Sequence, residues 1–493
     1  MKVILPDNQD VNSTRLDVRL KSSDNYHYLG FIRDIFVMIN RFCKGVLFVI
    51  FWIVGLSTFS QSRFTLPLNK KNDKIKFELA NNLIIIPVEL NGVELSFILD
   101  TGVGSTIIFS IDNKESLELK NATKIYLRGL GDEAPVEAIK SLDNTLKIGD
   151  AVSARHSVFL VFDESINFSP RMGFPIHGII GYDFFKDFIF DINYTKKVIK
   201  INTPDQYTYK KCDKCYRTNI NFSQQNKRPI LTAQYKAGDT LRDLRLLLDS
   251  GSGSSLWLFE DQKKGITIPK SSFPDFLGKG FNGDIYGSRS KISELHIGNF
   301  VLNNVTTAFP DSKYIQGIAL DKREGSLGGN VLRRFNLTID YPNQQITFKK
   351  NSFFNKPFYY NMSGLTIQHV GYNAIEPDPN IKNDNENVVY KATERNRVYL
   401  GINRVVNEKT LELSNYILRP KYEISDVRPN SPADLVGLQR GDLILEVNGK
   451  KAYQYKLSQL NDLFYFEEGK KIRMTIKRLG IELKYTFFLK KVI

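Results

Sequence analysis

The chain has 493 residues, of which 42% are hydrophobic and 25% are charged. This is the composition of ordinary globular domains, and the length corresponds to about three of them. The formal net charge is +15, but the lysine and arginine residues are spread along the chain without an Arg-rich run, which argues against nucleic-acid binding. The excess of positive charge indicates a basic, soluble surface. The alternative interpretation is that it attracts anionic surfaces or acidic substrates.

A short apolar segment near the N-terminus has the pattern of a secretory signal. Arg41 and Lys44 precede the apolar residues 45–56, and small and polar residues follow. The apolar core of 12 residues is shorter than the roughly 20 that a membrane-spanning helix needs. We expect residues 1–61 to be an N-terminal extension with a signal peptide, and the protein to be periplasmic, cell-surface or secreted. An uncleaved leader that anchors the chain is the alternative, and Met38 is an alternative start.

The region after the leader is expected to be mainly β. The apolar runs 83–90 and 93–99 flank Asn91-Gly92, which is a strong hairpin signal. Similar short runs bounded by turn residues continue through the next 250 or so positions, with few helical periods. We expect a first half over residues 62–205 and a second half over residues 206–352.

The two halves repeat one motif. Asp100-Thr101-Gly102 returns as Asp249-Ser250-Gly251 at a spacing of 149 positions, each motif after an apolar run and each followed by Gly-Ser. The same spacing relates the glycine pair Gly129 and Gly131 to the pair Gly278 and Gly280. Farther along, the spacing slips to 148, which aligns Gly181 with Gly329. A long repeat with several matched landmarks indicates a duplicated domain.

Two cysteines lie near the junction of the halves. Cys212 and Cys215 are separated by two residues, and in an exported chain this spacing favours a local disulfide. A zinc site would need further ligands nearby, and no His or Cys cluster supplies them. We expect no metal and no cofactor.

Two aspartates brought face to face can hydrolyse a peptide bond. Carboxylates a few ångströms apart do not both ionise easily, so Asp100 and Asp249 would share one proton. The charged member would take a proton from a bound water, and the neutral member would polarise the scissile carbonyl. Thr101 and Ser250 would brace the two loops. Gly102 and Gly251 would allow close approach of the backbones.

Residues 75–350 or so resemble the aspartic proteases of the retropepsin and pepsin type. The resemblance is carried by the twin Asp-Thr/Ser-Gly motifs, each followed some 80 residues later by an apolar-Gly element. It implies a bilobal fold of two homologous β-barrel-like halves, with ψ-loops at Ile179, Ile180 and Gly181 and at Leu327 and Gly328. The glycines of the two matched pairs are candidates for the tips of substrate-covering flaps; the alternative is that they are ordinary turn residues. The implied active unit is a monomer with an internal pseudo-dimer.

The C-terminal region, residues 353–493, is similar to a PDZ domain of the bacterial protease-associated kind. Ser431-Pro432-Ala433 reads as a capped helix start, and Gly441-Asp442 and Asn448-Gly449 are further landmarks of the family. The resemblance implies a peptide-carboxylate loop at Gly364, Leu365, Thr366 and Ile367. A polar insertion is expected near residues 371–398.

The sequence thus predicts an exported aspartic endopeptidase whose PDZ-like domain binds the termini of peptides or partners. The alternative is a non-catalytic protein that holds peptides in an inactive cleft and in the PDZ-like domain. Serine chemistry is disfavoured, because the Ser-rich stretch 250–255 lacks a nucleophile-elbow pattern. The expected partner is a peptide or protein substrate, not a nucleic acid.

Overall fold

The computed structural model describes residues 62–109, 117–127, 136–162, 167–223, 227–280, 283–315, 322–375, 417–465 and 467–493. These residues belong to one compact unit, Ser62–Ile493. The expected leader, including Met38 and the region where the leader would be cleaved, lies outside the described residues, as do Gly129 and Gly131. None of the helices in the described part of the chain is long and apolar enough to cross a membrane.

The first half of the protease-like region contains an eight-stranded sheet. Its hairpin of β3 and β4 turns at Asn91-Gly92, as the sequence predicts, with Leu90 opposite Val93. The strands, in spatial order, are β2 (Glu78–Ala80), β3 (Leu83–Leu90), β4 (Val93–Leu99), β9 (Gly178–Ile180), β5 (Thr106–Ile108), β8 (Ala151–Val161), β7 (Val136–Ile148) and β6 (Thr123–Leu127).

The second half contains an eight-stranded sheet whose strands follow the matching order. Each sheet also closes on itself through one extra pairing, β3 with β7 and β14 with β18. The strands are β13 (Asn221–Phe222), β14 (Pro229–Ala237), β15 (Thr240–Asp249), β20 (Gly325–Gly328), β16 (Leu256–Leu258), β19 (Phe300–Pro310), β18 (Gly283–Ile297) and β17 (Ser272–Gly280).

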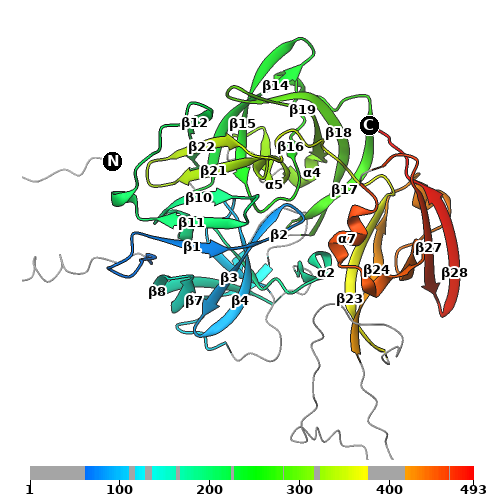
Figure 1. Ribbon diagram of the computed structural model, residues 1–493, viewed down its shortest axis with the longest axis horizontal. Coiled ribbons are helices and arrows are strands. Elements are labelled where there is room, and N and C mark those ends of the chain that lie inside the picture. Colours follow the sequence, from blue (N-terminus) through cyan, green and yellow to red (C-terminus); the bar gives the residue numbers. More distant parts are fainter. Residues whose placement is uncertain are drawn as a thin grey trace, which may run out of the picture. The chain divides into compact units, whose positions relative to one another are not determined.

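A six-stranded sheet joins the two halves. Its central pair is antiparallel and nearly symmetric, with Ile189 opposite Asp340 and Ile192 opposite Leu337 (Figure 1). The strands are β1 (Asn72–Lys76), β11 (Val198–Asn202), β10 (Ile189–Asn193), β21 (Phe335–Asp340), β22 (Gln345–Lys350) and β12 (Cys215–Asn219). The mainly β, two-barrel fold class expected from the sequence is confirmed.

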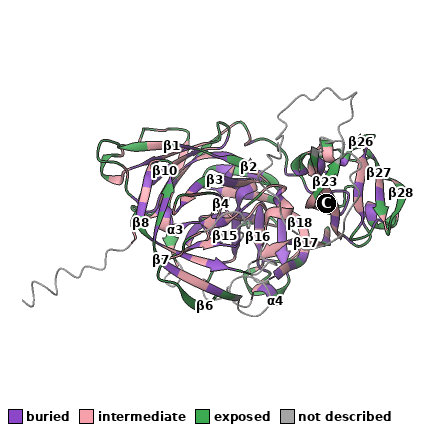
Figure 2. Ribbon diagram, turned by 90° about the horizontal axis from the view of Figure 1, so that it is seen from below, coloured by how far each residue is buried: buried purple, intermediate pink, exposed green. Residues whose placement is uncertain are grey.

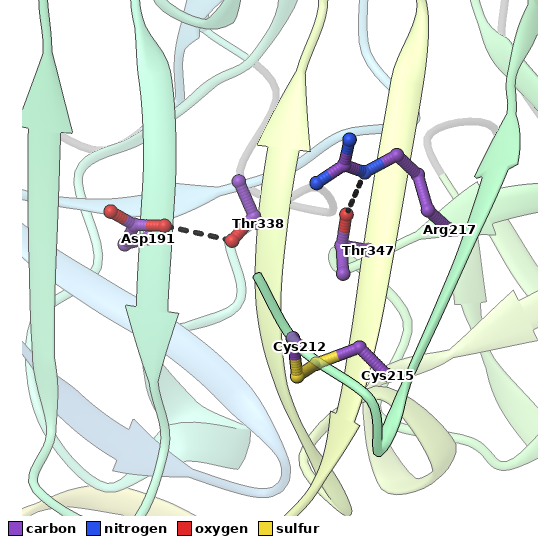
Figure 3. Close-up of a disulfide and its surroundings, with 6 residues drawn as sticks. All are labelled: Asp191, Cys212, Cys215, Arg217, Thr338 and Thr347. Atoms are coloured by element: carbon purple, nitrogen blue, oxygen red, sulfur yellow. Dashed lines mark hydrogen bonds between the residues drawn. A yellow bond between two sulfur atoms is a disulfide. The ribbon is translucent and has the colours of Figure 1, made fainter. Parts of the chain in front are cut away.

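The joining sheet carries the disulfide. Cys212 and Cys215 are bonded where the chain enters the edge strand β12 (Figure 3). On the same sheet, the Thr338 hydroxyl donates to Asp191 at 2.8 Å, which links β21 of the second half to β10 of the first (Figure 3). Hydrogen bonds between side chains of different halves add to the strand pairing.

Short helices follow the central strands of each half. Helix α3 begins directly after Gly181 and α5 directly after Gly328. The helical segments of the two halves are α2 (Ser169–Met172), α3 (Tyr182–Phe185), η2 (Pro204–Gln206), η3 (Gln262–Lys264), α4 (Ser312–Ile315) and α5 (Gly329–Leu332). One continuous apolar core spans both halves, and the C-terminal parts of β4 and β15, which lead to the aspartates, are buried in it (Figure 2).

The C-terminal domain is a separate sheet with two helices. Its α6 is capped as the sequence predicts, because the Ser431 hydroxyl accepts from the Asp434 N–H at 3.3 Å. The elements are β23 (Leu365–Ile375), β24 (Ile417–Val427), α6 (Pro432–Leu435), β25 (Leu443–Val447), β26 (Lys450–Lys451), η5 (Ala452–Gln454), α7 (Leu457–Asp462), β27 (Lys471–Arg478) and β28 (Ile481–Phe488).

Two expected boundaries need correction. Residues 371–375, placed by sequence in the polar insertion, belong to β23 and pair with β24; the rest of the insertion is outside the described residues. Phe354 and Phe358, placed in the PDZ-like domain, pack in the core of the protease-like region instead. The buried Arg334 holds this segment by donating to the backbone oxygens of Phe353, Phe354, Lys356 and Pro357. The core of the C-terminal domain begins at Tyr360.

Candidate active site

The two aspartates end matching strands and are held by parallel pairing. Asp100 follows β4, which pairs with β9, and Asp249 ends β15, which pairs with β20. The Asp100 N–H donates to the Ile180 oxygen at 2.8 Å. Each aspartate is thus fixed by a strand that returns from some 80 residues later in the chain.

Thr101 and Ser250 cross-link the two loops symmetrically. The Thr101 hydroxyl donates to the Leu248 oxygen at 2.6 Å and accepts from the Ser250 N–H at 3.0 Å. The Ser250 hydroxyl donates to the Leu99 oxygen at 2.8 Å and accepts from the Thr101 N–H at 3.0 Å. Both side chains are buried. These four hydrogen bonds form two equivalent pairs, one for each half, and they fix the two aspartate-bearing loops against each other.

The neighbouring glycines show how closely the carboxylates approach. A methyl group added at Gly102 would lie 3.2 Å from Asp100 Oδ1 and 3.3 Å from Asp249 Oδ1. A methyl group at Gly251 would overlap the Asp100 carboxylate. Glycine is required at these positions because each loop passes directly beside the carboxylates, one from each half. The structure brings Asp100 and Asp249 together as the sequence suggests.

Burial and mutual repulsion favour a shared proton. Loss of solvation, followed by the negative charge of Asp249, raises the pKa of Asp100 to about 7. Loss of solvation also raises the pKa of Asp249, while the positive charges of Arg323 and Arg228 oppose this rise. Both side chains are still partly exposed to the cavity above them. The pair can hold one proton and one negative charge in contact with a small ligand or water.

The ψ-loop residues lie at the crossing of the strands. Ile180 faces Leu99, and Leu327 faces Leu248. Gly181 and Gly328 each precede a helix, and a Cβ at either position would overlap backbone oxygens. The equivalent glycines are therefore Gly181 and Gly328, at a spacing of 147. The 148-residue spacing that aligned Gly181 with Gly329 is wrong, because the second return path is one residue shorter than that alignment assumes.

The flap candidates of the second half lie in the hairpin of β17 and β18. Gly278 marks a register shift in this hairpin and has φ +156, and Gly280 pairs with Gly283. Both glycines line the cavity that also contains the two aspartates. The hairpin thus borders the site, and its role as a substrate-covering flap stays a prediction.

This cavity has a volume of about 1370 Å³ and extends from the aspartates to the C-terminal domain. Besides both aspartate loops and the hairpin, its walls include Gly364, the first residues of β23 (Leu365 to Ile367) and Asn461 of α7. The hairpin also reaches into the core of the C-terminal domain. The Phe273 ring lies 5.5 Å from that of Tyr360, and the Arg428 guanidinium lies 4.3 Å above Phe273.

The expected peptide-carboxylate loop is internally bonded. The Asn361 side-chain oxygen accepts from the N–H groups of Ser363 and Gly364 at 3.0 and 3.1 Å. The Ser363 hydroxyl accepts from the Leu365 N–H at 3.0 Å. A peptide carboxylate that used these donors would have to displace the chain's own side chains. Binding of a terminus at this loop stays a prediction.

Sequence reasoning missed several residues at the site. Tyr341 donates to the Thr101 oxygen at 3.2 Å, and Arg228 and Arg323 line the cavity. Tyr341 follows an Asp-bearing strand at the position that Tyr194 holds in the first half, so the repeat could have drawn attention to it. No local pattern distinguishes Arg228 or Arg323 from the many other basic residues of the chain.

Two family models match stretches of the chain. Residues 86–184 match a family model described as aspartyl protease, and residues 423–478 match a PDZ domain model. An aspartic proteinase from Irpex lacteus is among the similar solved structures, at 11% identity and a TM-score of 0.38, covering 58% of this chain and 99% of that chain. A search of curated proteins gave no match. The matched stretches thus indicate an aspartyl protease domain that includes residues 86–184 and a PDZ domain that includes residues 423–478.

Proposed function

We propose that the protein is an aspartic endopeptidase. The proposal rests on one observation: four reciprocal hydrogen bonds of Thr101 and Ser250 hold Asp100 and Asp249 side by side at the base of a cavity. A carboxylate pair that shares a proton can activate water and protonate the carbonyl and leaving amine in turn. The PDZ domain implies a peptide or protein partner in its own right.

In the proposed mechanism, the ionised aspartate accepts a proton from a water between the two carboxyl groups. The protonated aspartate donates to the scissile carbonyl oxygen, which yields a neutral tetrahedral diol. On collapse the C–N bond breaks as the protonated aspartate gives its proton to the leaving nitrogen, and the ionised aspartate takes a proton from a diol hydroxyl, which restores the singly protonated pair. The buried hydroxyls of Thr101 and Ser250 keep the loops in place throughout, because their partners are backbone groups rather than the reacting atoms.

The test is peptide-library cleavage by the parent chain and by Asp100→Asn and Asp249→Asn. Each substitution keeps the side-chain shape and removes an ionisable group, so we expect kcat/KM to fall by at least about 1000-fold. Cleavage by both variants at the parent rate would contradict the proposal. Peptide binding by the parent without any products would favour the alternative, a non-catalytic peptide-binding protein.

We also propose that the protein works outside the cytoplasm and that one chain suffices for activity. Export is supported by the leader pattern at residues 41–60 and by the disulfide of Cys212 and Cys215. A single active chain is supported by the presence of both aspartates in one polypeptide. N-terminal sequencing of the mature protein tests the first proposal. Specific activity that is independent of protein concentration is the expected result for the second.

A further inference from the structure

The walls of the cavity are rich in positive charge. Among the described residues, nine lysines and arginines line it, whereas only three acidic residues do so besides the two aspartates of the site. The acidic residues are Asp183, Asp275 and Asp462. The basic residues are Arg171, Lys227, Arg228, Lys279, Arg289, Arg323, Arg333, Lys356 and Arg428.

Some of this charge is neutralised by neighbouring carboxylates. Asp275 lies 2.5 Å from Arg289 and 3.7 Å from Arg428, and Arg171 lies 3.4 Å from Asp284. The first of these pairs lies within the hairpin of β17 and β18, and the other two join the hairpin to Arg428 and Arg171. They account for three of the basic residues, and the cavity lining as a whole keeps an excess of basic over acidic side chains.

Two lysines from different parts of the chain line the cavity that also contains the aspartates. The Lys227 ammonium lies 4.9 Å above the ring of Tyr182, the first residue of α3. Lys279 belongs to the hairpin strand β17 and pairs with Asp284 across the hairpin backbone. Among the described residues, neither lysine has a carboxylate within ion-pair distance. Both lysines line the cavity, and the charge of Lys227 also opposes the rise in the pKa of Asp183.

The positive field also reaches the reacting groups. The charge of Arg228 lowers the pKa of both Asp100 and Asp249, and that of Arg323 lowers the pKa of Asp249. A field that acts on these carboxylates acts equally on substrate side chains next to the scissile bond. Partial burial strengthens such interactions relative to those on an open surface.

We propose that the cleft selects peptides with acidic side chains flanking the cleaved bond, and that Lys227 and Lys279 contribute to this selection. The inference rests on the proposed peptidase function for its turnover, but peptide binding alone can test it. Complementary charge raises the association rate as well as the affinity, and salt weakens both effects. The apolar parts of the cavity would take the residues at the bond itself.

The experiment uses three short fluorescent peptides with one shared apolar centre and glutamate, glutamine or lysine in the flanking positions. Their binding to the intact Asp249→Asn chain is measured by anisotropy at low and high ionic strength. We expect the glutamate peptide to bind about tenfold more tightly than the lysine peptide at low salt, and the difference to shrink at high salt. Equal affinities at low salt would overturn the proposal.

Charge-reversal variants test whether Lys227 and Lys279 cause the preference for the glutamate peptide. Lys227→Glu with Lys279→Glu, added to Asp249→Asn, should abolish or invert the preference. Lys196→Glu is the matched control, because Lys196 is exposed in the turn after β10 and does not line the cavity. If the control and the double reversal behave alike, the assignment to these lysines is wrong.

Cleavage of the same three peptides by the parent chain separates this inference from the proposed function. Faster cleavage of the glutamate peptide supports both. Cleavage of all three at equal kcat/KM supports the peptidase and overturns the charge selection. Selective binding without cleavage of any peptide supports the charge selection and contradicts the peptidase.

Discussion

The two halves of the protease domain share their strand order but differ in their outer hairpins. At positions matched by the strand register, β6 of the first half carries Thr123, which is exposed, whereas β17 of the second half carries Phe273, which is 7% exposed. Phe273 is buried among residues of the PDZ domain. The second hairpin therefore serves as a connection between domains as well as a wall of the cavity.

The comparison also shows where symmetry is kept. Thr101 and Ser250 make the same bonds in each direction, whereas the matched tyrosines differ. Tyr341 donates to the Thr101 oxygen, and the Tyr194 hydroxyl is buried without a hydrogen-bond partner among the described residues. Symmetry is strict where the two loops must hold the carboxylates together. It is relaxed where the halves meet different neighbours.

The largest expected effect comes from breaking the symmetric centre. Thr101→Val removes one hydroxyl at nearly constant volume and leaves the Leu248 oxygen and the Ser250 N–H unpaired in a buried site. We expect a loss of about 3–5 kcal/mol in the free energy of unfolding, with kcat/KM reduced by more than about 100-fold. Chemical denaturation and peptide cleavage are the measurements. Ser250→Ala should lower the free energy of unfolding by a similar amount, and Thr101→Ser should lower it little. A large difference between Thr101→Val and Ser250→Ala would show that the two hydroxyl groups do not contribute equally.

The next effect tests the difference between the hairpins. Phe273→Ala should lower the free energy of unfolding by about 3 kcal/mol, because it leaves a cavity beside Tyr360 and Arg428 in the PDZ core. Thr123→Ala, at the matched and exposed position of the first half, should change it by less than about 0.5 kcal/mol. Thermal or denaturant unfolding measures both. Equal costs for the two variants would show that the second hairpin is not an interdomain connection.

The third prediction concerns pH and the aspartate pair. In the folded protein the pKa of Asp100 rises from 3.8 to about 7, so the folded state binds more protons than the unfolded state in this range. The contribution of Asp100 to stability is then fully present below pH 4 or so and is lost as the pH rises toward 7. Asp249→Asn relieves the repulsion, and its stability relative to the parent should grow by roughly 2 kcal/mol between about pH 4 and pH 8.

Melting temperatures of the two proteins across this pH range check the prediction. The exposed Asp205→Asn is the matched control and should show no such trend. A difference between Asp249→Asn and the parent that stays constant with pH would contradict a shared proton at the site.

The smallest effect compares the two edges of the joining sheet. The disulfide lies at the start of the edge strand β12, whereas the opposite edge strand β1 contains no cysteine. Because the bond closes a very short loop, the double variant Cys212→Ser with Cys215→Ser should lose only about 1–2 kcal/mol of stability. Unfolding under oxidising conditions measures this loss. A loss as large as that of Phe273→Ala would mean that β12 organises more of the fold than its edge position suggests.

Much of the fold could be predicted from local sequence. The Asn91-Gly92 turn, the Ser431 helix cap and the twin Asp motifs are short patterns whose backbone chemistry acts within a few residues. The repeat then implied that the two motifs meet. The alignment of Gly181 with Gly329 in the repeat was wrong by one residue, because the length of a return path depends on strand register, which a short glycine pattern does not specify.

The sequence by itself determined the duplicated β architecture, the pair of aspartates and the presence of a PDZ domain. Only the tertiary structure decided that Phe354 and Phe358 pack in the protease core, that Phe273 packs in the PDZ core, and that the basic residues gather around one cavity. The physical reason is the range of the interactions. Turns, caps and strand alternation arise between near neighbours, whereas burial and summed charge depend on which distant segments pack together.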